Sequence, residues 1–571
     1  MKREDSAVKY VLDGGEAIVE AYRNLGVDYV FSSPGSEWGS VWEAFARQKV
    51  NNVPGPTYLS CWHETLAVDL ALGYTAVTGR MQAVLLHAGV GLLQGAMGIH
   101  GARLTVTPMV IMSGESLTFG DREGFNPGSQ WYTGHNIVGG LQRVIEPVVK
   151  WASQATSPET LYDMVIRAGE LAQSTPAGPV YLDVPIETML HPWTPLAKLR
   201  KLPRAPRPRP SVADIEKLAG MLVSARNPVI TTSACGRDVE GYKALLELAE
   251  LLAIPVVESF VAEVSNFPKD HPLHQGFEMQ PFLEGSDLVL VIRCRIPWYP
   301  PNKGPRNATV VVIDDNAFKV HMAYQNLQAD MLLEGDVTSS VKLLAEAVRA
   351  ARPDAARVAE RKARWAAAHD RLEESYRAAE AQARARKAID PVMLNATLAE
   401  VLPKNATYVD ETTTHRGRNQ RHVRYQGPQS YFRAPSGLGQ GLGVALGIKL
   451  ASPDRLVIPL IGDGAFLYNP VTQCLGFSKR ENLPLLVVVY NNNGYRGMRN
   501  NQLSYYPEGA GARHQIFYGE TIGGPAYEQL ATPFDGVGIR VEDPARLKSA
   551  LAEGYAAVQA GKTAIVNVVM E

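Results

Sequence analysis

Two polar turns in the last third of the chain carry the residue types that bind a hard metal ion. Asp463 stands between two glycines in the segment PLIGDGAF, and Asn492 belongs to the segment VVVYNNNGYRGM. An aspartate carboxylate, an asparagine amide and the free carbonyl at Gly494 offer the oxygens that Mg²⁺ takes from proteins, together with phosphate and water. Glycines beside the aspartate let the backbone approach a phosphate closely, and the start of a helix supplies free N–H groups. A Gly-Asp-Gly turn alone is also an ordinary β-turn, but the two turns together favour a site for a metal ion and a phosphate.

The fold must bring these turns together, and the sequence predicts a parallel sheet that does so. A helical stretch and a second apolar strand separate the turns, which places consecutive strand ends side by side. Short β-branched runs alternate with longer helical patterns in three blocks of the chain, which indicates parallel sheets covered by helices. We therefore expect an α/β protein with three doubly wound parallel-sheet domains and ligands at the carboxyl ends of the strands. The expected strands lie within residues 27–35, 82–91, 107–115, 228–236, 287–295, 309–315, 406–414, 455–464, 484–493 and 563–570.

Two seams divide the chain. Residues 191–210 are rich in proline and basic residues and read as a linker without regular structure. Residues 351–388 are rich in alanine, arginine and glutamate; the alternatives are a disordered spacer or one or two exposed helices, and the alanine content favours helix. The expected domains are residues 1–190, 211–350 and 389–571.

Composition excludes several classes of function. The chain has 57 basic and 58 acidic residues and a net charge of -1, so no basic field is available for nucleic acid. Its four cysteines show no CxxC spacing, which argues against a zinc site or a disulfide scaffold and fits a reducing cytosol. The N-terminus lacks the apolar region of a signal peptide, and no apolar run is long enough to span a membrane. We expect a cytoplasmic protein that binds neither nucleic acid nor membrane.

The pattern of GDG, a helix, ENLP, an apolar strand and NNNG resembles a known cofactor motif. It is similar to the thiamine-diphosphate-binding motif of the family that includes pyruvate decarboxylase, acetolactate synthase and benzoylformate decarboxylase. The resemblance implies that Asp463, Asn492 and the Gly494 carbonyl hold Mg²⁺ and, through it, the diphosphate. Asn493 remains a one-residue alternative to Asn492. The resemblance also places four neighbouring residues at the cofactor: Gly462, Gly464, Ala465 and Tyr495.

This resemblance implies an acid that activates the aminopyrimidine ring of the cofactor. The segment CWHETLAVDLALGYTAVTGR resembles the corresponding stretch of the family, and Glu64 occupies its glutamate position. We expect Glu64 on an amphipathic helix of the first domain, where its carboxyl would drive the amino group of the cofactor toward its imine form. The alternative is a surface glutamate without a role in catalysis.

Two further segments resemble cofactor-binding parts of the family. In FRAPSGLGQGLGVALG, Leu438 falls at the position of the wedge that bends the cofactor, and Ser436 would offer its carbonyl to the cofactor amine; the alternative for Leu438 is a core leucine. In VDETTTHRG, Thr413 and Thr414 would bind the diphosphate, whereas threonines at such positions also cap helices.

The segments SSPGSEWGSVWEAF and LLHAGVGLLQGAMG resemble benzoylformate decarboxylase most. The resemblance places Ser36 and His87 as the residues that bind a 2-oxo acid carboxylate and shuttle protons. Ser36 as a helix cap and His87 as a satisfied buried histidine remain the alternatives.

The implied activity is decarboxylation of a 2-oxo acid, carboligation of the product to an aldehyde or ketone, or both. An acyloin or 2-hydroxyacyl lyase and a catalytically silent regulatory protein are the alternatives. The middle domain lacks the small Gly-Ala-Arg turn of the flavin enzymes, so we expect no FAD. The family also implies a homodimer or homotetramer, in which Glu64 of one subunit activates a cofactor whose diphosphate the other subunit holds.

Overall fold

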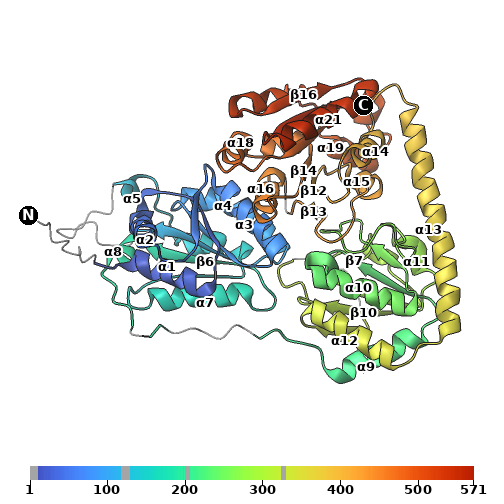
Figure 1. The fold of residues 1–571 in the computed structure, drawn as a ribbon, viewed down its shortest axis with the longest axis horizontal. Helices are drawn as coiled ribbons and strands as arrows, with labels where there is room; N and C mark the ends of the chain where they lie inside the picture. Colours follow the sequence, from blue (N-terminus) through green and yellow to red (C-terminus); the bar gives the residue numbers. More distant parts are fainter. Residues whose placement is uncertain are drawn as a thin grey trace, which may run out of the picture. The chain divides into compact units, whose positions relative to one another are not determined.

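The computed structural model describes residues 11–116, 129–196, 198–199, 206–322, 329–435 and 437–570. The chain divides into two compact units, Met1–Pro206 and Arg207–Glu571. The described residues form three entirely parallel sheets, one in the first unit and two in the second, and this confirms the predicted fold class (Figure 1). All ten predicted strands are present.

The sheet of the first unit has the strand order β2-β1-β3-β4-β6-β5. Alternate strand residues point to opposite faces. Val30 and Leu85 therefore pack with α1 and α7 in one core, whereas Leu86 lies on the other face, close to Gly95 of α4. The strands are β1 (Tyr29–Ser33), β2 (Thr57–Ser60), β3 (Gln82–Leu86), β4 (Met109–Glu115), β5 (Trp151–Gln154) and β6 (Pro179–Pro185); the helices are α1 (Gly14–Leu25), α2 (Gly39–Val50), α3 (Glu64–Thr78), α4 (Val90–Leu104), α5 (Gln130–Thr133), α6 (Leu141–Ile145), α7 (Leu161–Gln173) and α8 (Ile186–Leu190), with the 3₁₀ turn η1 at Ser36–Trp38.

The helix that begins at Glu64 is not amphipathic, so that expectation was wrong. Residues 65–73 of α3 are all buried, and Val68 lies directly against Gly95 and Gly98 of α4. A helix that is buried all round has no polar face to show in its sequence. The helix is instead a central element that fixes Glu64 at its first turn.

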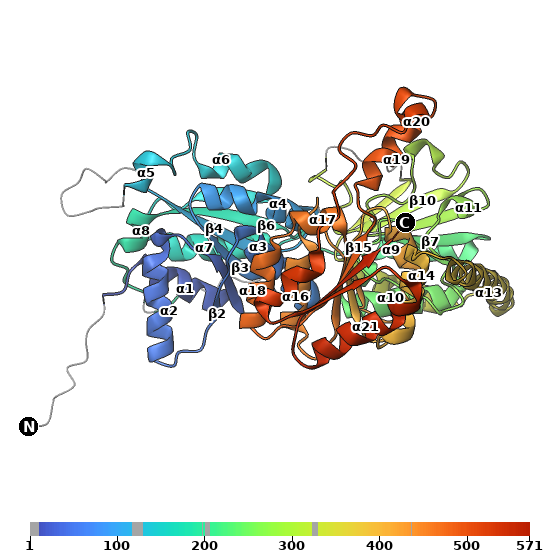
Figure 2. The same cartoon turned by 90° about the horizontal axis from the view of Figure 1, so that it is seen from above.

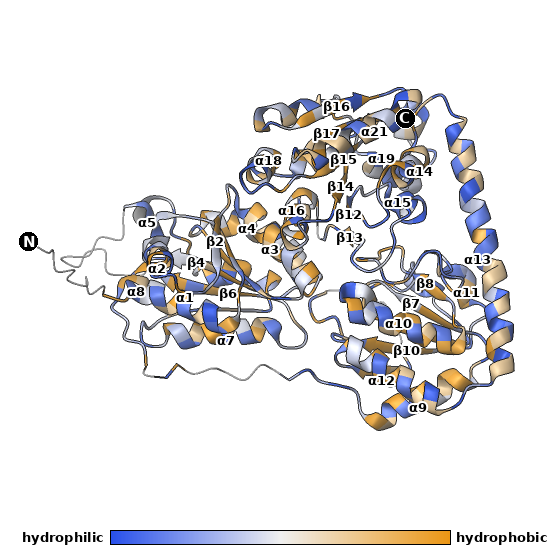
Figure 3. Cartoon of the chain, in the orientation of Figure 1, coloured by the Kyte–Doolittle hydropathy of each residue, from blue (hydrophilic) through white to orange (hydrophobic). Residues whose placement is uncertain are grey.

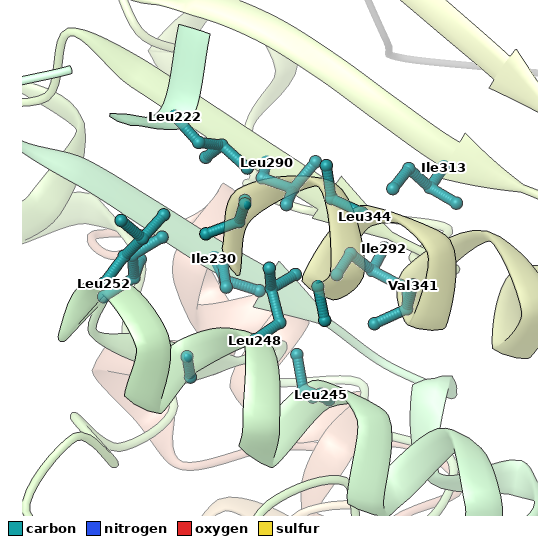
Figure 4. Packing of buried hydrophobic residues seen from close by; sticks show 14 of the residues in the cluster. Leu222, Ile230, Leu245, Leu248, Leu252, Leu290, Ile292, Ile313, Val341 and Leu344 are labelled. Carbon is teal, nitrogen blue, oxygen red and sulfur yellow. The ribbon is translucent and has the colours of Figure 1, made fainter. Parts of the chain in front are cut away.

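The middle sheet, in the second unit, has the order β11-β10-β9-β7-β8. Figure 4 shows its core, where leucines of α10 and α12 meet Ile230, Leu290 and Ile292 of the strands. The strands are β7 (Pro228–Thr232), β8 (Val256–Glu258), β9 (Leu288–Ile292), β10 (Thr309–Asp314) and β11 (Met331–Glu334); the helices are α9 (Val212–Ser224), α10 (Val239–Leu252), α11 (Gln280–Leu283) and α12 (Val337–Ala350).

The last sheet, β13-β12-β14-β15-β17-β16, repeats the strand order of the first. Figure 2 shows α19 and α20 extending away from its strands. The strands are β12 (Thr407–Glu411), β13 (Tyr431–Arg433), β14 (Val457–Gly462), β15 (Leu486–Asn491), β16 (Val537–Val541) and β17 (Ala564–Val569); the helices are α14 (Pro391–Val401), α15 (Arg416–His422), α16 (Gly441–Ala451), α17 (Asp463–Tyr468), α18 (Val471–Arg480), α19 (Arg496–Tyr505), α20 (Ala510–His514) and α21 (Pro544–Gln559).

One long helix, α13 (Ala355–Arg384), spans the seam between the two domains of the second unit (Figure 1). The alternatives for this segment were a disordered spacer or one or two exposed helices, and the structure has one helix. This helix is largely hydrophilic (Figure 3). Near its start Arg361 donates to the carbonyl of Leu252 in the middle domain, and further on Glu380 pairs with His422 of the last domain. The helix thus holds both domains. No described helix is long and apolar enough to cross a membrane.

The strand order of the first and last sheets reverses at one point in each. In the first sheet the chain winds in opposite directions from β1 and β3, and in the last sheet from β12 and β14. Ligands of doubly wound proteins bind at the carboxyl ends of the strands at such a switch point. The segments that follow these four strands are therefore the places to look for a site.

The middle core offers a stability test. Leu248 is fully buried, so Leu248→Ala should lower the free energy of unfolding by about 2–5 kcal/mol through lost burial and a cavity. The matched control is Val212→Ala, which truncates an apolar side chain that is 71% exposed. Chemical denaturation, with hydrogen exchange of the β7 and β9 amides, measures both. Equal losses in the two variants would contradict the assigned core.

Candidate active site

The last sheet places a carboxylate and an amide oxygen at one backbone N–H. Asp463 is the first residue of α17, directly after β14, and Asn492 follows β15. The Gly494 N–H lies 3.1 Å from Asp463 Oδ2 and 3.2 Å from Asn492 Oδ1. Both residues are buried: 3% of Asp463 and 5% of Asn492 is exposed. The two turns singled out in the sequence therefore meet at the carboxyl edge of the sheet.

The three consecutive asparagines have three different environments. The Asn491 amide donates to Asn567 Oδ1 at 3.0 Å inside the sheet. Asn493 is exposed and adopts a left-handed backbone with φ of 56°. Asn492 is the one whose oxygen shares a donor with Asp463. The geometry therefore favours Asn492 over Asn493 as a ligand.

The donor set at this edge fits a cation. Burial raises the pKa of Asp463, and the backbone N–H groups of Gly464, Gly494 and their neighbours oppose that shift. A bound cation stabilises the charged form of such a carboxyl. The turn also depends on its glycines: a Cβ at Gly494 would lie 2.7 Å from the Glu520 carbonyl, and one at Gly464 would lie 2.4 Å from the Tyr495 ring. Tyr495 thus packs on the start of α17, beside the buried Ala465.

Glu411 organises the same edge, and the sequence analysis did not include it. Its carboxylate accepts the N–H groups of Gly439, Gln440 and Gly441 at 2.6–3.0 Å and the Asn469 amide at 2.8 Å. These bonds hold the turn that carries Leu438, which is half-buried. The sequence does carry a signal for Glu411, because it is an acidic residue at the very end of an apolar strand. Ser436 lies outside the described residues.

Thr413 and Thr414, the predicted diphosphate contacts, follow β12 at this edge of the sheet. Thr413 is exposed and left-handed, with φ of 50°, and Thr414 lies beside Gly497 at the start of α19. Neither threonine caps the following helix, because the N-cap of α15 is His415 and its side chain makes no capping bond. A Cβ at Gly462 would make only ordinary van der Waals contact, with the Thr412 carbonyl nearest at 3.7 Å. The helix-cap alternative is therefore not what the structure adopts.

The first sheet assembles a second cluster at its own switch point. Ser36 follows β1 and His87 follows β3. Ser36 is exposed and caps no helix; its oxygen accepts the Gln130 amide at 2.9 Å. The Gln130 oxygen in turn lies 3.2 Å from His135 Nε2, and the His135 ring meets the His87 ring edge-on at 4.7 Å. The two predicted residues thus belong to one polar network.

Glu64 reaches the same cluster from α3. A Cβ at Gly91 would lie 2.8 Å from the Cβ of His87 and 3.2 Å from Glu64 Oε1, so the two side chains flank this glycine. Glu64 is half-buried at the first turn of its helix. The three residues predicted to be catalytic therefore lie together in the first unit.

A buried glutamate missed in the sequence analysis holds His87. The Glu37 side chain is fully buried, both its oxygens lie 3.0 Å from His87 Nδ1, and Oε1 accepts the Ala88 N–H at 2.8 Å. The hydrogen bond that His87 donates to the Glu37 carboxylate raises the pKa of His87; burial of the ring opposes this shift, and the charge of Glu64 adds to it. His87 is thus held toward its charged form. Glu37 is next to Ser36 in the sequence, but no feature of the neighbouring sequence indicates that it pairs with His87.

Three family models match the chain, and all three describe thiamine pyrophosphate enzymes. They are the N-terminal binding domain at residues 12–126, the central domain at 215–344 and the C-terminal binding domain at 411–568. The chain belongs to the thiamine pyrophosphate enzyme family. It is an enzyme of the thiamine-diphosphate-dependent decarboxylase and acetolactate synthase type, which confirms the resemblance noted in the sequence.

Relatives in this thiamine pyrophosphate enzyme family match along nearly the whole chain. Acetolactate synthase isozyme 3 large subunit of Escherichia coli is 25% identical over 98% of this chain and 95% of its own length. Benzoylformate decarboxylase of Pseudomonas aeruginosa is 26% identical over 85% of this chain and 86% of its own. The solved thiamine diphosphate-dependent 4-hydroxybenzoylformate decarboxylase of Rhodococcus jostii shares the fold, with a TM-score of 0.77 and 23% identity over 98% of this chain and 99% of its own.

The Glu37–His87 pair predicts a pH response. Glu37→Gln should lower the pKa of His87, because the main cause of its upward shift is removed. Since the folded-state pKa is raised, the pair stabilises the fold below the ordinary histidine pKa, and this contribution is lost as the pH rises through the raised value. NMR titration of ¹³C-labelled histidines, assigned with His87→Asn, measures the shift. Glu64→Gln is the control and should produce a smaller decrease; a larger decrease there would contradict the assignment.

Proposed function

We propose that the protein decarboxylates a 2-oxo acid with thiamine diphosphate and Mg²⁺. The observation that carries this proposal is the cluster in which His87, held toward its charged form by buried Glu37, lies beside Glu64 and in one network with Ser36. A positive imidazolium and a neutral hydroxyl are the groups that bind a small carboxylate and then supply a proton. The benzoylformate decarboxylase and 4-hydroxybenzoylformate decarboxylase among the similar proteins carry 2-oxo acids in their names, which supports this substrate class.

The residues of the last sheet would hold the cofactor. Asp463, Asn492 and the Gly494 carbonyl would bind Mg²⁺, whose oxygen preference they meet. When bound, thiamine diphosphate supplies an electron sink for the carbanion that remains after CO₂ departs. The residues proposed around it are Thr413, Thr414, Ser436, Leu438, Gly462, Gly464, Ala465 and Tyr495.

The chain's own residues would divide the remaining work. The Ser36 hydroxyl would donate a hydrogen bond to the substrate carboxylate, and the Glu64 carboxyl would hold a proton at the aminopyrimidine ring. Conversion of a 2-oxo acid to an aldehyde and CO₂ consumes one proton, and His87 is placed to deliver it. Glu37, which raises the pKa of His87, would favour the protonated form that delivers it.

We propose that the enzyme is a homodimer or homotetramer. Val90, Leu93 and Met97 form an apolar stripe on α4 that is 43–53% exposed, and a second copy would cover it. Glu64 of one subunit would then serve a cofactor held by the partner. We also propose a cytoplasmic setting: the four cysteines lack CxxC spacing, and all four are buried.

Product analysis tests the reaction. The protein, with Mg²⁺ and thiamine diphosphate, is incubated with pyruvate or benzoylformate, each with and without an added aldehyde, and products are identified by mass spectrometry. We expect free aldehyde from the preferred acid. A hydroxyketone as the sole product would instead establish the second candidate, a carboligase, which the acetolactate synthase relatives favour. Absence of both products would contradict the proposal and turn the search to acyloin or 2-hydroxyacyl cleavage.

The proposed acid has its own test. Glu64→Gln should lower kcat by about 10²–10⁴-fold, because the amide cannot exchange a proton with the cofactor ring. Thiamine diphosphate binding, measured by calorimetry, should change little. Glu16→Gln, which changes a glutamate of α1 bonded to Arg23 and Arg47, is the control for loss of a charge in the same unit. Full activity in Glu64→Gln would rule out the assigned role.

A further inference from the structure

The side-chain amide of Asn492 has two ends, and each meets a different partner. Its oxygen lies 3.2 Å from the Gly494 N–H, and its nitrogen lies 3.1 Å from Nε2 of His415. The Gly494 N–H can only donate a hydrogen bond, so the end of the Asn492 amide that faces Gly494 and Asp463 must be the oxygen. The nitrogen end then faces His415. Asn492 and His415 are both more than nine-tenths buried.

The amide nitrogen also fixes what His415 does. An NH₂ group only donates, so Nε2 must accept, and the ring proton must be on Nδ1. The contact is therefore a directed hydrogen bond from Asn492 to His415.

The His415 ring has little freedom to turn. It stacks on the Tyr490 ring at 5.8 Å and 27°, and the Tyr490 hydroxyl donates to Asn395 at 2.5 Å. The His415 carbonyl accepts the N–H groups of Arg418 and Asn419 at the start of α15. The His415 ring is held by its stack on Tyr490 of β15 and by its backbone bonds to α15. Its Nε2 acceptor can therefore fix which end of the Asn492 amide faces it.

We propose that His415 is a positioning residue that directs the oxygen of Asn492, rather than its NH₂ group, toward the metal ion. This inference rests on the proposed function, because it presumes Mg²⁺ at Asp463 and Asn492. An amide turned by half a revolution presents N–H donors to a cation and repels it. Fixing the amide in advance removes that competing state, as partners of metal ligands commonly do.

The test measures Mg²⁺-dependent binding of thiamine diphosphate by calorimetry at a series of Mg²⁺ concentrations, with no substrate. His415→Phe keeps an aromatic ring on Tyr490 but removes the acceptor, and it should weaken the apparent Mg²⁺ affinity about 10–100-fold. His415→Gln offers an acceptor oxygen and should recover most of the loss. Equal weakening in both variants, or none in His415→Phe, would overturn the inference.

A double-mutant cycle separates direction from packing. In Asn492→Asp the two ends of the side chain are equivalent oxygens, so direction no longer matters. His415→Phe in that background should cost less than about threefold, well below its effect in the native chain. A cost as large as in the native chain would assign His415 a merely structural role and overturn the proposal.

Two further measurements keep the outcome clear. If His415→Phe does not fold, ¹⁵N NMR of the histidines in the native protein decides, because an Nε2–H tautomer of His415 overturns the inference and an Nδ1–H tautomer supports it.

Asp463→Ala distinguishes failure of the positioning role from failure of the proposed metal site. Loss of Mg²⁺ dependence in Asp463→Ala together with unchanged His415→Phe refutes only the positioning role. Unchanged Mg²⁺ dependence in Asp463→Ala refutes the metal site and, with it, this inference.

Discussion

An ionised carboxylate that leaves water must find hydrogen-bond donors inside the protein, and this requirement organises both strand-end clusters. Glu37, Glu411 and Asp463 are each almost completely buried. Backbone N–H groups meet all three: Ala88 for Glu37, the Gly439–Gly441 turn for Glu411, and Gly464 and Gly494 for Asp463. An unpaired buried charge costs several kcal/mol, so each carboxylate fixes the loop that supplies its donors. The carboxylates therefore set the shape of the loops at the ligand-binding edge.

The same requirement explains where glycine is needed. A Cβ at Gly441 would lie 2.7 Å from Glu411 Oε2, and one at Gly114 would lie 2.5 Å from Glu37 Cγ. At these two positions the buried carboxylate leaves no room for a side chain, so glycine is needed there.

The two clusters stand at equivalent places in two sheets of equal strand order. One brings together carboxylate and amide oxygens, and the other brings together an imidazole, a hydroxyl and a carboxyl. The difference lies in the residues that follow the strands, since the two sheets share their topology. The two clusters therefore differ in the loops that a common scaffold carries.

Apolar runs and glycine turns are local signals, so the sequence alone predicts ten of the strands, the three-sheet architecture and the turns at Asp463 and Asn492. It misses β6, an interior strand that is buried along its whole length, and edge strands such as β2, β5 and β16, which are short and largely not buried. It also predicts for α3 an exposed face that the fold does not leave. The contacts of Asn492 with the Asp463 turn, of His415 with the Asn492 amide and of Glu37 with His87 follow from the tertiary structure alone. These contacts join residues tens of positions apart. They depend on strand register and on how a buried charge is satisfied, and neither leaves a periodic trace in the sequence.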